Sequence, residues 1–521
     1  MMRIHTTRRF AGLVGAVVAL SAASPAALAH RTPPGGSGGS TQAQTPMPSI
    51  ATGGGRGVPR PVQARQASPI RHVVVIYLEN HSFDNLLGYW CDQNPGRCPD
   101  GGMPATVTLS NGVVVRPKRA PDVVPNVNHS VAAQVAAMNI VNGVPLMNGW
   151  ENIPYGGGNQ FGCTAARHWQ CITGYEPSQI PNITNLATRF AISDDTFSMA
   201  DSPSWGGHLY AAMGSLDGFT GDNPFSVKGV TPPPGPGWGC DSNLVTPWIA
   251  PDGKHHPEPS CIPDYHLNPA EYPHDGAFRH TPAAPHATIF DGLAAAGLTW
   301  RIYGQAVAEG HGASDGYGWS ICPSLAQCLY TSQRADLVDS SQFFADATAG
   351  TLPAFSIVTA GGSADGLGDG KPGVYTSCHN GFSMTACDDY IGALVGAVED
   401  SPDWSSTAVF ITFDDFGGFY DQVPPGTNPD GTQQGPRSPL IIVSPYARPG
   451  FTDTTPASFA SILAYTERNF GLAPLGPNDA GAYSYSAAFS YSQQPDRRVH
   501  MVRRPVPKGD RIQWWEARQD S

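Results

Sequence analysis

The feature that most constrains this 521-residue chain is a set of three short apolar runs, at residues 72–78, 407–413 and 440–443. Each run is rich in β-branched or aromatic residues and shows no alternation of polar and apolar side chains. This pattern is typical of strands that are covered on both faces. Segments 289–296 and 390–399, which lie between the runs, have helical character. Strands that alternate with helices predict an α/β fold with a mostly parallel central sheet.

Acidic and amide side chains follow two of these runs directly. Glu79 and Asn80 come after the first run, and Asp414 and Asp415 come after the second. Because ligands of open α/β sheets bind beyond the carboxyl ends of the strands, we expect these four side chains at one rim of the sheet. Oxygen ligands of this kind suit a hard divalent cation, which also relieves the repulsion between carboxylates. The alternative is that the acids are helix N-caps, and we adopt that interpretation for Asp84.

Both ends of the chain differ in composition from the middle. Residues 1–29 combine a basic start, an apolar run and a small-residue cleavage site, which predicts a signal peptide with weak twin-arginine features. A short membrane anchor is the alternative for this segment. Residues 30–69 are rich in Gly, Pro, Ser, Thr and Gln and are predicted to be a flexible linker. Residues 493–521 form a basic tail that we expect to be a solvated extension.

The balance of charge restricts the partners of the protein. The formal net charge is −12, and basic residues cluster only in the tail. Nucleic-acid binders usually carry a basic stripe, so we expect no nucleic-acid partner. After removal of the signal peptide we expect no transmembrane segment, and a location outside the cell or on its surface. The sequence makes no prediction of the oligomeric state.

The ten cysteines fall into five pairs that are local in sequence, each in a loop rich in Gly or Pro. An even number of cysteines in an exported chain predicts disulfides. A zinc site is the alternative, but the sequence contains no CxxC motif. We therefore expect five disulfides that pin long loops: Cys91–Cys98, Cys163–Cys171, Cys240–Cys261, Cys322–Cys328 and Cys378–Cys387.

Three segments carry a resemblance to a known family. Residues 79–84 (ENHSFD), 413–421 (FDDFGGFYD) and 435–445 (GPRSPLIIVSP) resemble motifs of the bacterial phosphoesterase family that contains phospholipases C and acid phosphatases. The resemblance extends over residues 70–492, which we interpret as the catalytic domain. It implies a fold similar to alkaline phosphatase, with helices on both faces of the central sheet.

The resemblance also implies roles for individual residues. The hydroxyl nucleophile of the family falls on Ser204, and two active-site histidines fall on His129 and His379. The metal positions of the family fall on the residues that follow the strands: Glu79, Asn80, Asp414 and Asp415. His208 lies four residues after Ser204 and is a candidate phosphate-binding residue.

This chain departs from the family pattern at two positions. The adjacent histidines that some members have before the late motif are absent around Trp319, and Gln422 stands where some members have a histidine. These differences concern the substrate pocket and leave the metal and nucleophile positions in place.

The expected activity is hydrolysis of phosphate esters with a divalent metal ion and a seryl nucleophile. Phospholipase C action on phospholipids is our first expectation. A broad-specificity acid phosphatase is the second, and a catalytically silent protein that binds phosphate-bearing surfaces is the third.

Overall fold

The computed structural model describes residues 68–156, 160–199, 203–226, 238–242, 244–249, 253–263, 287–304, 316–360, 376–495 and 498–507. The predicted signal peptide, residues 1–29, and residues 30–67 of the predicted linker lie outside the described residues. All described residues belong to one structural unit, Arg65–Ser521.

The centre of this unit is an eight-stranded sheet. Its strand order is β13 (Leu337–Asp339), β12 (Trp300–Gly304), β14 (Phe355–Val358), β1 (His72–Leu78), β15 (Thr407–Phe413), β17 (Leu440–Val443), β8 (Ala191–Ser193) and β18 (Thr452–Asp453). The three predicted runs coincide with β1, β15 and β17. Nearly every residue of these strands is buried, as the lack of alternation predicts.

The directions of the strands confirm a mostly parallel sheet. β1 is parallel to both β14 and β15, and β12 is parallel to β13 and β14. β17 runs against both of its neighbours, β15 and β8. β1 and β15 therefore end at the same rim, while β17 ends at the opposite one.

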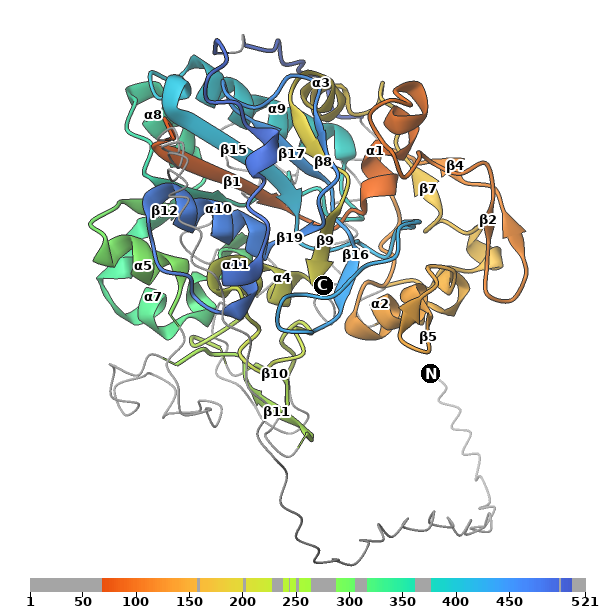
Figure 1. Ribbon diagram of the computed structural model, residues 1–521. Coiled ribbons are helices and arrows are strands. Elements are labelled where there is room, and N and C mark those ends of the chain that lie inside the picture. Colours follow the sequence, from red (N-terminus) through yellow and green to blue (C-terminus); the bar gives the residue numbers. More distant parts are fainter. Residues whose placement is uncertain are drawn as a thin grey trace, which may run out of the picture. The chain divides into compact units, whose positions relative to one another are not determined.

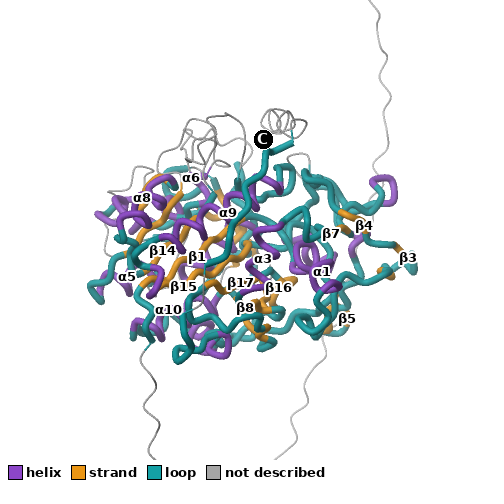
Figure 2. Tube along the Cα trace, turned by 90° about the horizontal axis from the view of Figure 1, so that it is seen from above, coloured by secondary structure: helices purple, strands orange, loops and turns teal. Residues whose placement is uncertain are grey.

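Helices cover both faces of the sheet, as expected. Figure 1 shows α3 (Pro181–Arg189), α8 (Ser341–Ala349) and α9 (Met384–Asp400) on one side of the strands. The other side carries α4 (Ser204–Met213), α5 (Ile289–Ala295) and α10 (Ala460–Phe470). Seen from above, the strands run side by side from β14 through β1 and β15 to β17 (Figure 2). The helices predicted at 289–296 and 390–399 correspond to α5 and to part of α9.

Smaller elements surround this core. A three-stranded sheet contains β16 (Gln434–Arg437), β9 (Thr196–Met199) and β19 (Ala457–Ser458). Four two-stranded sheets are β2 (Val107–Thr108) with β3 (Val114–Val115), β4 (Lys118–Arg119) with β7 (Thr173–Gly174), β5 (Ile140–Val141) with β6 (Val144–Pro145), and β10 (Val245–Ile249) with β11 (His255–Pro259). The remaining helices of the described chain are α1 (Phe83–Gln93), α2 (Val131–Met138), α6 (Gly316–Trp319), α7 (Ala326–Tyr330) and α11 (Pro477–Gly481).

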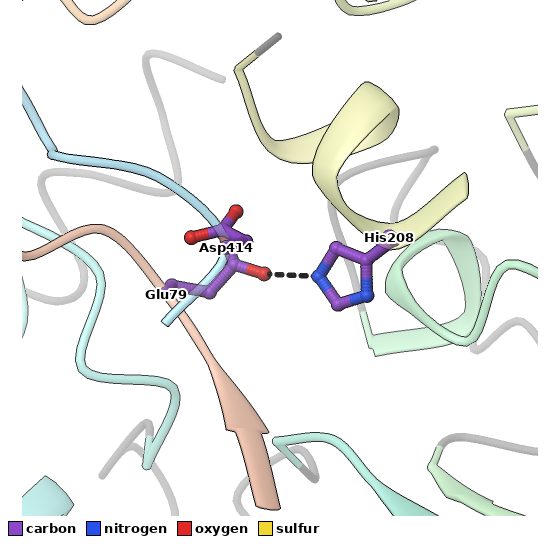
Figure 3. A group of neighbouring side chains, drawn as sticks. All are labelled: Glu79, His208 and Asp414. Carbon is purple, nitrogen blue, oxygen red and sulfur yellow. Dashed lines mark hydrogen bonds and ion pairs between the residues drawn. The ribbon is translucent and has the colours of Figure 1, made fainter. Parts of the chain in front are cut away.

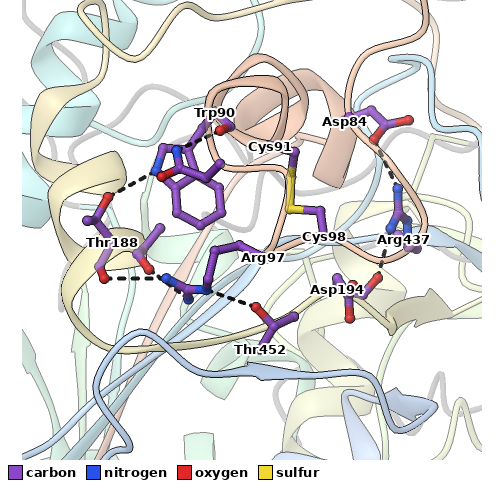
Figure 4. The surroundings of a disulfide bond; sticks show 12 residues. Asp84, Trp90, Cys91, Arg97, Cys98, Thr188, Asp194, Arg437 and Thr452 are labelled. Atoms are coloured by element: carbon purple, nitrogen blue, oxygen red, sulfur yellow. Dashed lines mark hydrogen bonds and ion pairs between the residues drawn. A yellow bond between two sulfur atoms is a disulfide. The ribbon is translucent and has the colours of Figure 1, made fainter.

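All five predicted disulfides are formed, and this excludes a zinc site made by the cysteines. The Cys91–Cys98 bridge holds the loop that contains Arg97 (Figure 4). Arg97 Nη2 donates to the carbonyls of Ala187 and Phe451, each at 3.0 Å. This loop is therefore fastened to the segments beside β8 and β18.

The described parts of the basic tail, residues 493–495 and 498–507, contact the folded domain, whereas we expected a solvated extension. The backbone N–H of Val502 donates to Asn182 Oδ1 at 2.7 Å, and Asn182 Nδ2 donates back to the Val502 carbonyl at 2.8 Å. Arg504 Nη2 lies 2.7 Å from Asp388 Oδ2. This part of the tail thus joins α3 to α9. Among the described residues, no helix combines the length and the apolar character that a membrane span requires.

Candidate active site

The ends of β1 and β15 bring the four predicted metal-ligating residues together. Leu78 pairs with Phe413 in the register of the two strands, so the residues that follow leave the sheet side by side. Glu79 is 2% exposed, and the other three side chains are fully buried: Asn80, Asp414 and Asp415. The prediction that they share one rim is confirmed, and their roles stay predictions.

Asn80 links the two strand ends. Its backbone N–H donates to Asp414 Oδ1 at 2.9 Å, and its Nδ2 donates to Asp415 Oδ2 at 2.7 Å. The same Nδ2 lies 3.2 Å from Ser204 Oγ. Asn80 has a φ of 55°, a left-handed conformation that asparagine tolerates better than most residues. One amide therefore connects the predicted nucleophile to both aspartates.

Ser204 is the first residue of α4 and is fully buried. The helix comes unusually close to the end of β15, because residue 207 is a glycine. A Cβ atom at Gly207 would lie 2.7 Å from the Asp414 carbonyl oxygen and 3.2 Å from the Tyr77 hydroxyl. The glycine thus allows α4 to place Ser204 against the acidic residues.

His208 lies one helical turn after Ser204, on the same face of α4. Its Nε2 is 3.0 Å from Glu79 Oε1 (Figure 3), and its ring meets the Tyr77 ring edge-on at 4.8 Å. Glu79, His208 and Asp414 offer ligand atoms that all lie within 4.8 Å of one another, so this group could bind a metal ion. The structure places His208 beside the predicted metal ligands, and its contact with phosphate stays a prediction. Its spacing from Ser204 was the only signal in the sequence.

The electrostatics of the acidic group fit a divalent cation. Burial, together with the charge of Asp415, raises the pKa of Glu79 to about 8. Burial and the charges of Glu79 and Asp415 raise the pKa of Asp414 well above its usual value. Glu79 Oε2 and Asn80 Oδ1 are buried and have no hydrogen-bond partner among the described residues. Unpaired oxygens beside carboxylates that resist ionisation are what a bound cation would satisfy.

His129 and His379 form a second pair near the acidic group, with ring centroids 5.4 Å apart. Nδ1 of His129 lies 2.8 Å from the Val127 carbonyl, and Nδ1 of His379 lies 2.7 Å from the Asn380 carbonyl. Because a carbonyl can only accept, both Nδ1 atoms carry a hydrogen, and Nε2 is the nitrogen of each ring that can exchange a proton. Burial lowers the pKa of His379 to about 3, so this ring is neutral near pH 7.

His129 is also electrostatically close to the strand ends. Burial raises the pKa of Asp415, and the charge of His129 counteracts that rise. Asn380 fastens the loops together, since its Nδ2 donates to the Val127 carbonyl at 3.2 Å and to the Gly417 carbonyl at 3.1 Å. The Cys378–Cys387 disulfide closes the loop that carries His379. We did not predict a role for Asn380, although it directly follows His379.

A buried ion triad joins the segments that follow β1 and β15 to the end of β16, and it corrects our interpretation of Asp84. The N-cap of α1 is Ser82, which accepts from the Asn85 N–H at 3.2 Å. Asp84 Oδ1 instead pairs with Arg437 Nη2 at 3.0 Å, and Arg437 Nε pairs with Asp421 Oδ1 at 2.8 Å. All three members of the triad are fully buried. Each of them lies in one of the three family-like segments, but nothing in the sequence indicated that they meet.

Fold and site together define an α/β enzyme that is equipped to hydrolyse phosphoric esters: a buried hydroxyl, three carboxylates and imidazole rings meet at one rim of the sheet. The chain belongs to the phosphoesterase family, whose sequence model matches residues 70–473. It is a phosphoric ester hydrolase.

Named relatives agree with this class. The chain is 24% identical to non-specific phospholipase C1 of Arabidopsis thaliana, over 87% of this chain and 76% of that protein. It is 26% identical to non-hemolytic phospholipase C of Burkholderia pseudomallei, over 42% of this chain and 40% of that protein. The solved structure of a protein in the alkaline phosphatase superfamily from Vibrio parahaemolyticus is similar to this chain at 14% sequence identity and a TM-score of 0.30. The match covers 66% of this chain and 80% of that protein's chain. The fold class follows from the topology of the eight-stranded sheet.

Proposed function

We propose that this protein is a metal-dependent phospholipase C that cleaves the glycerol-side P–O bond of a phospholipid through Ser204. One observation carries the proposal: Ser204 Oγ, Asp414 and Asp415 all contact the side chain of Asn80. The hydroxyl is thereby held beside the group that suits a cation. The two relatives named above, both phospholipases C, support the choice of substrate.

The residues that would hold the cation are the four at the strand ends, with His208 adjoining Glu79. A divalent ion bound there would polarise the phosphoryl oxygens and lower the pKa of the Ser204 hydroxyl. Without such help a serine hydroxyl is a weak nucleophile. The hydrogen bonds from Asn80 to Asp414 and Asp415 fix the carboxylates before the substrate arrives.

In the first step Ser204 Oγ attacks phosphorus, and the bond from phosphorus to the glycerol oxygen breaks. The Ser204 proton leaves to solvent, and the leaving glycerol oxygen receives a proton from solvent through Nε2 of His129. In the second step water attacks the seryl phosphodiester and loses a proton through His129 Nε2 to solvent, while the Ser204 oxygen leaves phosphorus and regains a proton from solvent. Burial lowers the pKa of His379 to about 3, so near pH 7 this ring has no second proton to donate. We assign it the role of holding the His129 ring in place.

The test compares Ser204→Ala with Ser215→Ala, a matched control just beyond the end of α4. Phosphatidylcholine, p-nitrophenyl phosphorylcholine and p-nitrophenyl phosphate serve as substrates, with and without a chelator. We expect Ser204→Ala to lose nearly all turnover and still bind metal, and Ser215→Ala to resemble the wild type. Acid quenching of the wild-type reaction should yield a peptide that carries phosphocholine on Ser204.

If water attacked phosphorus directly and Ser204 only oriented it, the alanine variant would lose ~10²–10³-fold, as for a lost positioning hydrogen bond. That residual rate, combined with an unmodified peptide, would rule out the covalent step. Faster turnover of p-nitrophenyl phosphate than of both choline substrates would favour the acid phosphatase alternative. No turnover of any substrate with metal bound would favour the silent binding protein.

We also propose that the protein acts outside the cytoplasm. Five disulfides are common in exported proteins and rare in the reducing cytosol, which supports this location. Immunodetection in the culture medium and in cell fractions tests it, and protein found only inside intact cells would contradict it.

A further inference from the structure

The stretch of chain around His129 has no charged residues of its own and presents exposed apolar side chains. Residues 123–150 contain no Asp, Glu, Lys or Arg, although 14% of the whole chain is charged. This stretch includes His129, helix α2 and the β5–β6 hairpin. Five of its large apolar side chains are exposed by 40–56%: Val135, Ile140, Val141, Val144 and Leu146. We call these five side chains the hairpin surface. Exposed apolar clusters of this kind usually mark a contact with another molecule.

The hairpin that presents this surface is rigid. Asn142 and Gly143 form its two-residue turn, and both have positive φ angles (52° and 79°), as the tightest hairpin turns require. The backbone N–H groups of Leu146 and Met147 both donate to the Met138 carbonyl at the end of α2. Trp150, which is fully buried, anchors the chain after the hairpin against Phe416 and Tyr420. The turn, the two hydrogen bonds and the buried Trp150 thus fix the hairpin with its apolar side chains exposed.

A hydrogen bond joins α2, the helix after His129, to the strand that precedes Ser204. α2 begins immediately after His129, and Gln134 in its second turn donates to the Met199 carbonyl at 3.0 Å. Met199 ends β9, the strand that precedes Ser204. Figure 1 shows α2 and the β5–β6 hairpin beside β16, on the flank of the domain next to β9. Both predicted catalytic segments therefore border this flank.

An exposed aromatic ring lies on the segment that contacts the residue before His129. Tyr155 is 63% exposed, and the carbonyl of its neighbour Pro154 accepts from Asn128 Nδ2 at 3.0 Å. Asn128 directly precedes His129. Tyrosine favours the boundary between apolar and aqueous phases, because its ring is apolar and its hydroxyl is wet.

We propose that the hairpin surface and Tyr155 dock the enzyme on the surface of a neutral or zwitterionic lipid layer, and so bring the layer's headgroups to the site. The inference rests on the proposed function, because a phospholipid substrate is presented in such a layer. The chemistry favours this occupant: the five side chains of the hairpin surface carry no charge, so they enter the hydrocarbon boundary and gain nothing from anionic headgroups. Binding should therefore persist when salt is added.

The experiment uses the full protein and sucrose-loaded phosphatidylcholine vesicles, with a chelator present so that binding is read separately from turnover. The variant is Val141→Lys with Val144→Glu, because these two residues face each other across the hairpin. The new charges can pair, and together they leave the net charge unchanged. The matched control is Ile249→Glu, which changes an exposed apolar residue (43%) on β10. Melting temperature and turnover of monomeric p-nitrophenyl phosphorylcholine report folding and the integrity of the site.

We expect the wild type and Ile249→Glu to bind the vesicles at low and high salt alike. The hairpin variant should bind at least tenfold more weakly, lose a similar factor in vesicle hydrolysis, and keep its turnover of the monomeric substrate. Equal vesicle binding by all three proteins, or binding that salt abolishes, would overturn the proposal. A wild-type dimer that the hairpin variant converts to monomers, with vesicle binding unchanged, would also overturn it and assign the surface to a second copy of the chain. If the hairpin dependence of binding is found but phosphatidylcholine is not hydrolysed after metal is restored, the docking surface stands and the proposed activity fails.

Discussion

Gly207 offers a sharp test of how closely α4 must approach the acidic strand ends. In Gly207→Ala the new Cβ atom would sit 2.7 Å from the Asp414 carbonyl oxygen and 3.2 Å from the Tyr77 hydroxyl. To relieve these contacts α4 has to retreat by about half an ångström, because such overlaps strain a packed interior. Ser204, three residues earlier on the same helix, moves with it. A misplacement of 1 Å at a reacting group can cost ~10²-fold, so about tenfold lower kcat is expected.

The stability of this variant separates a positional effect from unfolding. Alanine favours a helix interior over glycine by ~1 kcal/mol, which offsets part of the strain, so the melting temperature should change little. The matched control is Gly396→Ala in α9, where a Cβ atom would meet nothing closer than Met501 Cγ at 3.8 Å. The control should gain stability and keep its kcat. The assays are turnover of p-nitrophenyl phosphorylcholine, bound metal by elemental analysis, and thermal unfolding. Wild-type kcat in Gly207→Ala, with the control behaving as expected, would refute the need for the close approach.

Two further predictions concern stability. Arg437→Met should lower the free energy of unfolding by about 3–5 kcal/mol, because it leaves Asp84 and Asp421 buried without their counter-charge. Urea unfolding measures this free energy, and a loss below about 1 kcal/mol would contradict the prediction. Burial and the neighbouring Asp479 raise the pKa of Glu467 to about 8, so the folded protein keeps a proton that the unfolded chain loses near pH 4.5. The stability of the wild type should therefore fall as the pH rises from about 4.5 to about 8. Over this range the melting temperature of Glu467→Gln should rise relative to that of the wild type. A constant difference between the two melting temperatures would show that Glu467 does not titrate with folding.

The central strands were predictable from sequence because a buried strand needs a continuous apolar run, and β1, β15 and β17 all have one. The direction of β17 could not be predicted, because an apolar run has the same pattern in a parallel and in an antiparallel strand. It runs against β15 because the chain returns through β16 without crossing the sheet in a helix.

The site was predictable only where strand ends determine it. Glu79, Asn80, Asp414 and Asp415 meet because two parallel neighbours end together. The contact between His208 and Glu79 depends on the position of α4, and no local pattern encodes that position. Asp84 was misassigned because a local rule for helix starts competed with a distant partner, Arg437, and the buried ion pair prevailed.

The sheet topology has a consequence for biosynthesis. β1 is the first strand of the sheet, but both of its neighbours come much later, since β14 begins at Phe355 and β15 at Thr407. Such non-local pairing makes folding slow, because most of the chain has to be available before the sheet can form. Until then the run at 72–78 is an unpaired apolar segment with a high tendency to aggregate. The Cys91–Cys98 and Cys163–Cys171 bridges span only 7 and 8 residues and can close without the sheet, but they leave this strand uncovered. We therefore expect a nascent chain that ends before residue 413 to depend on a chaperone that shields β1.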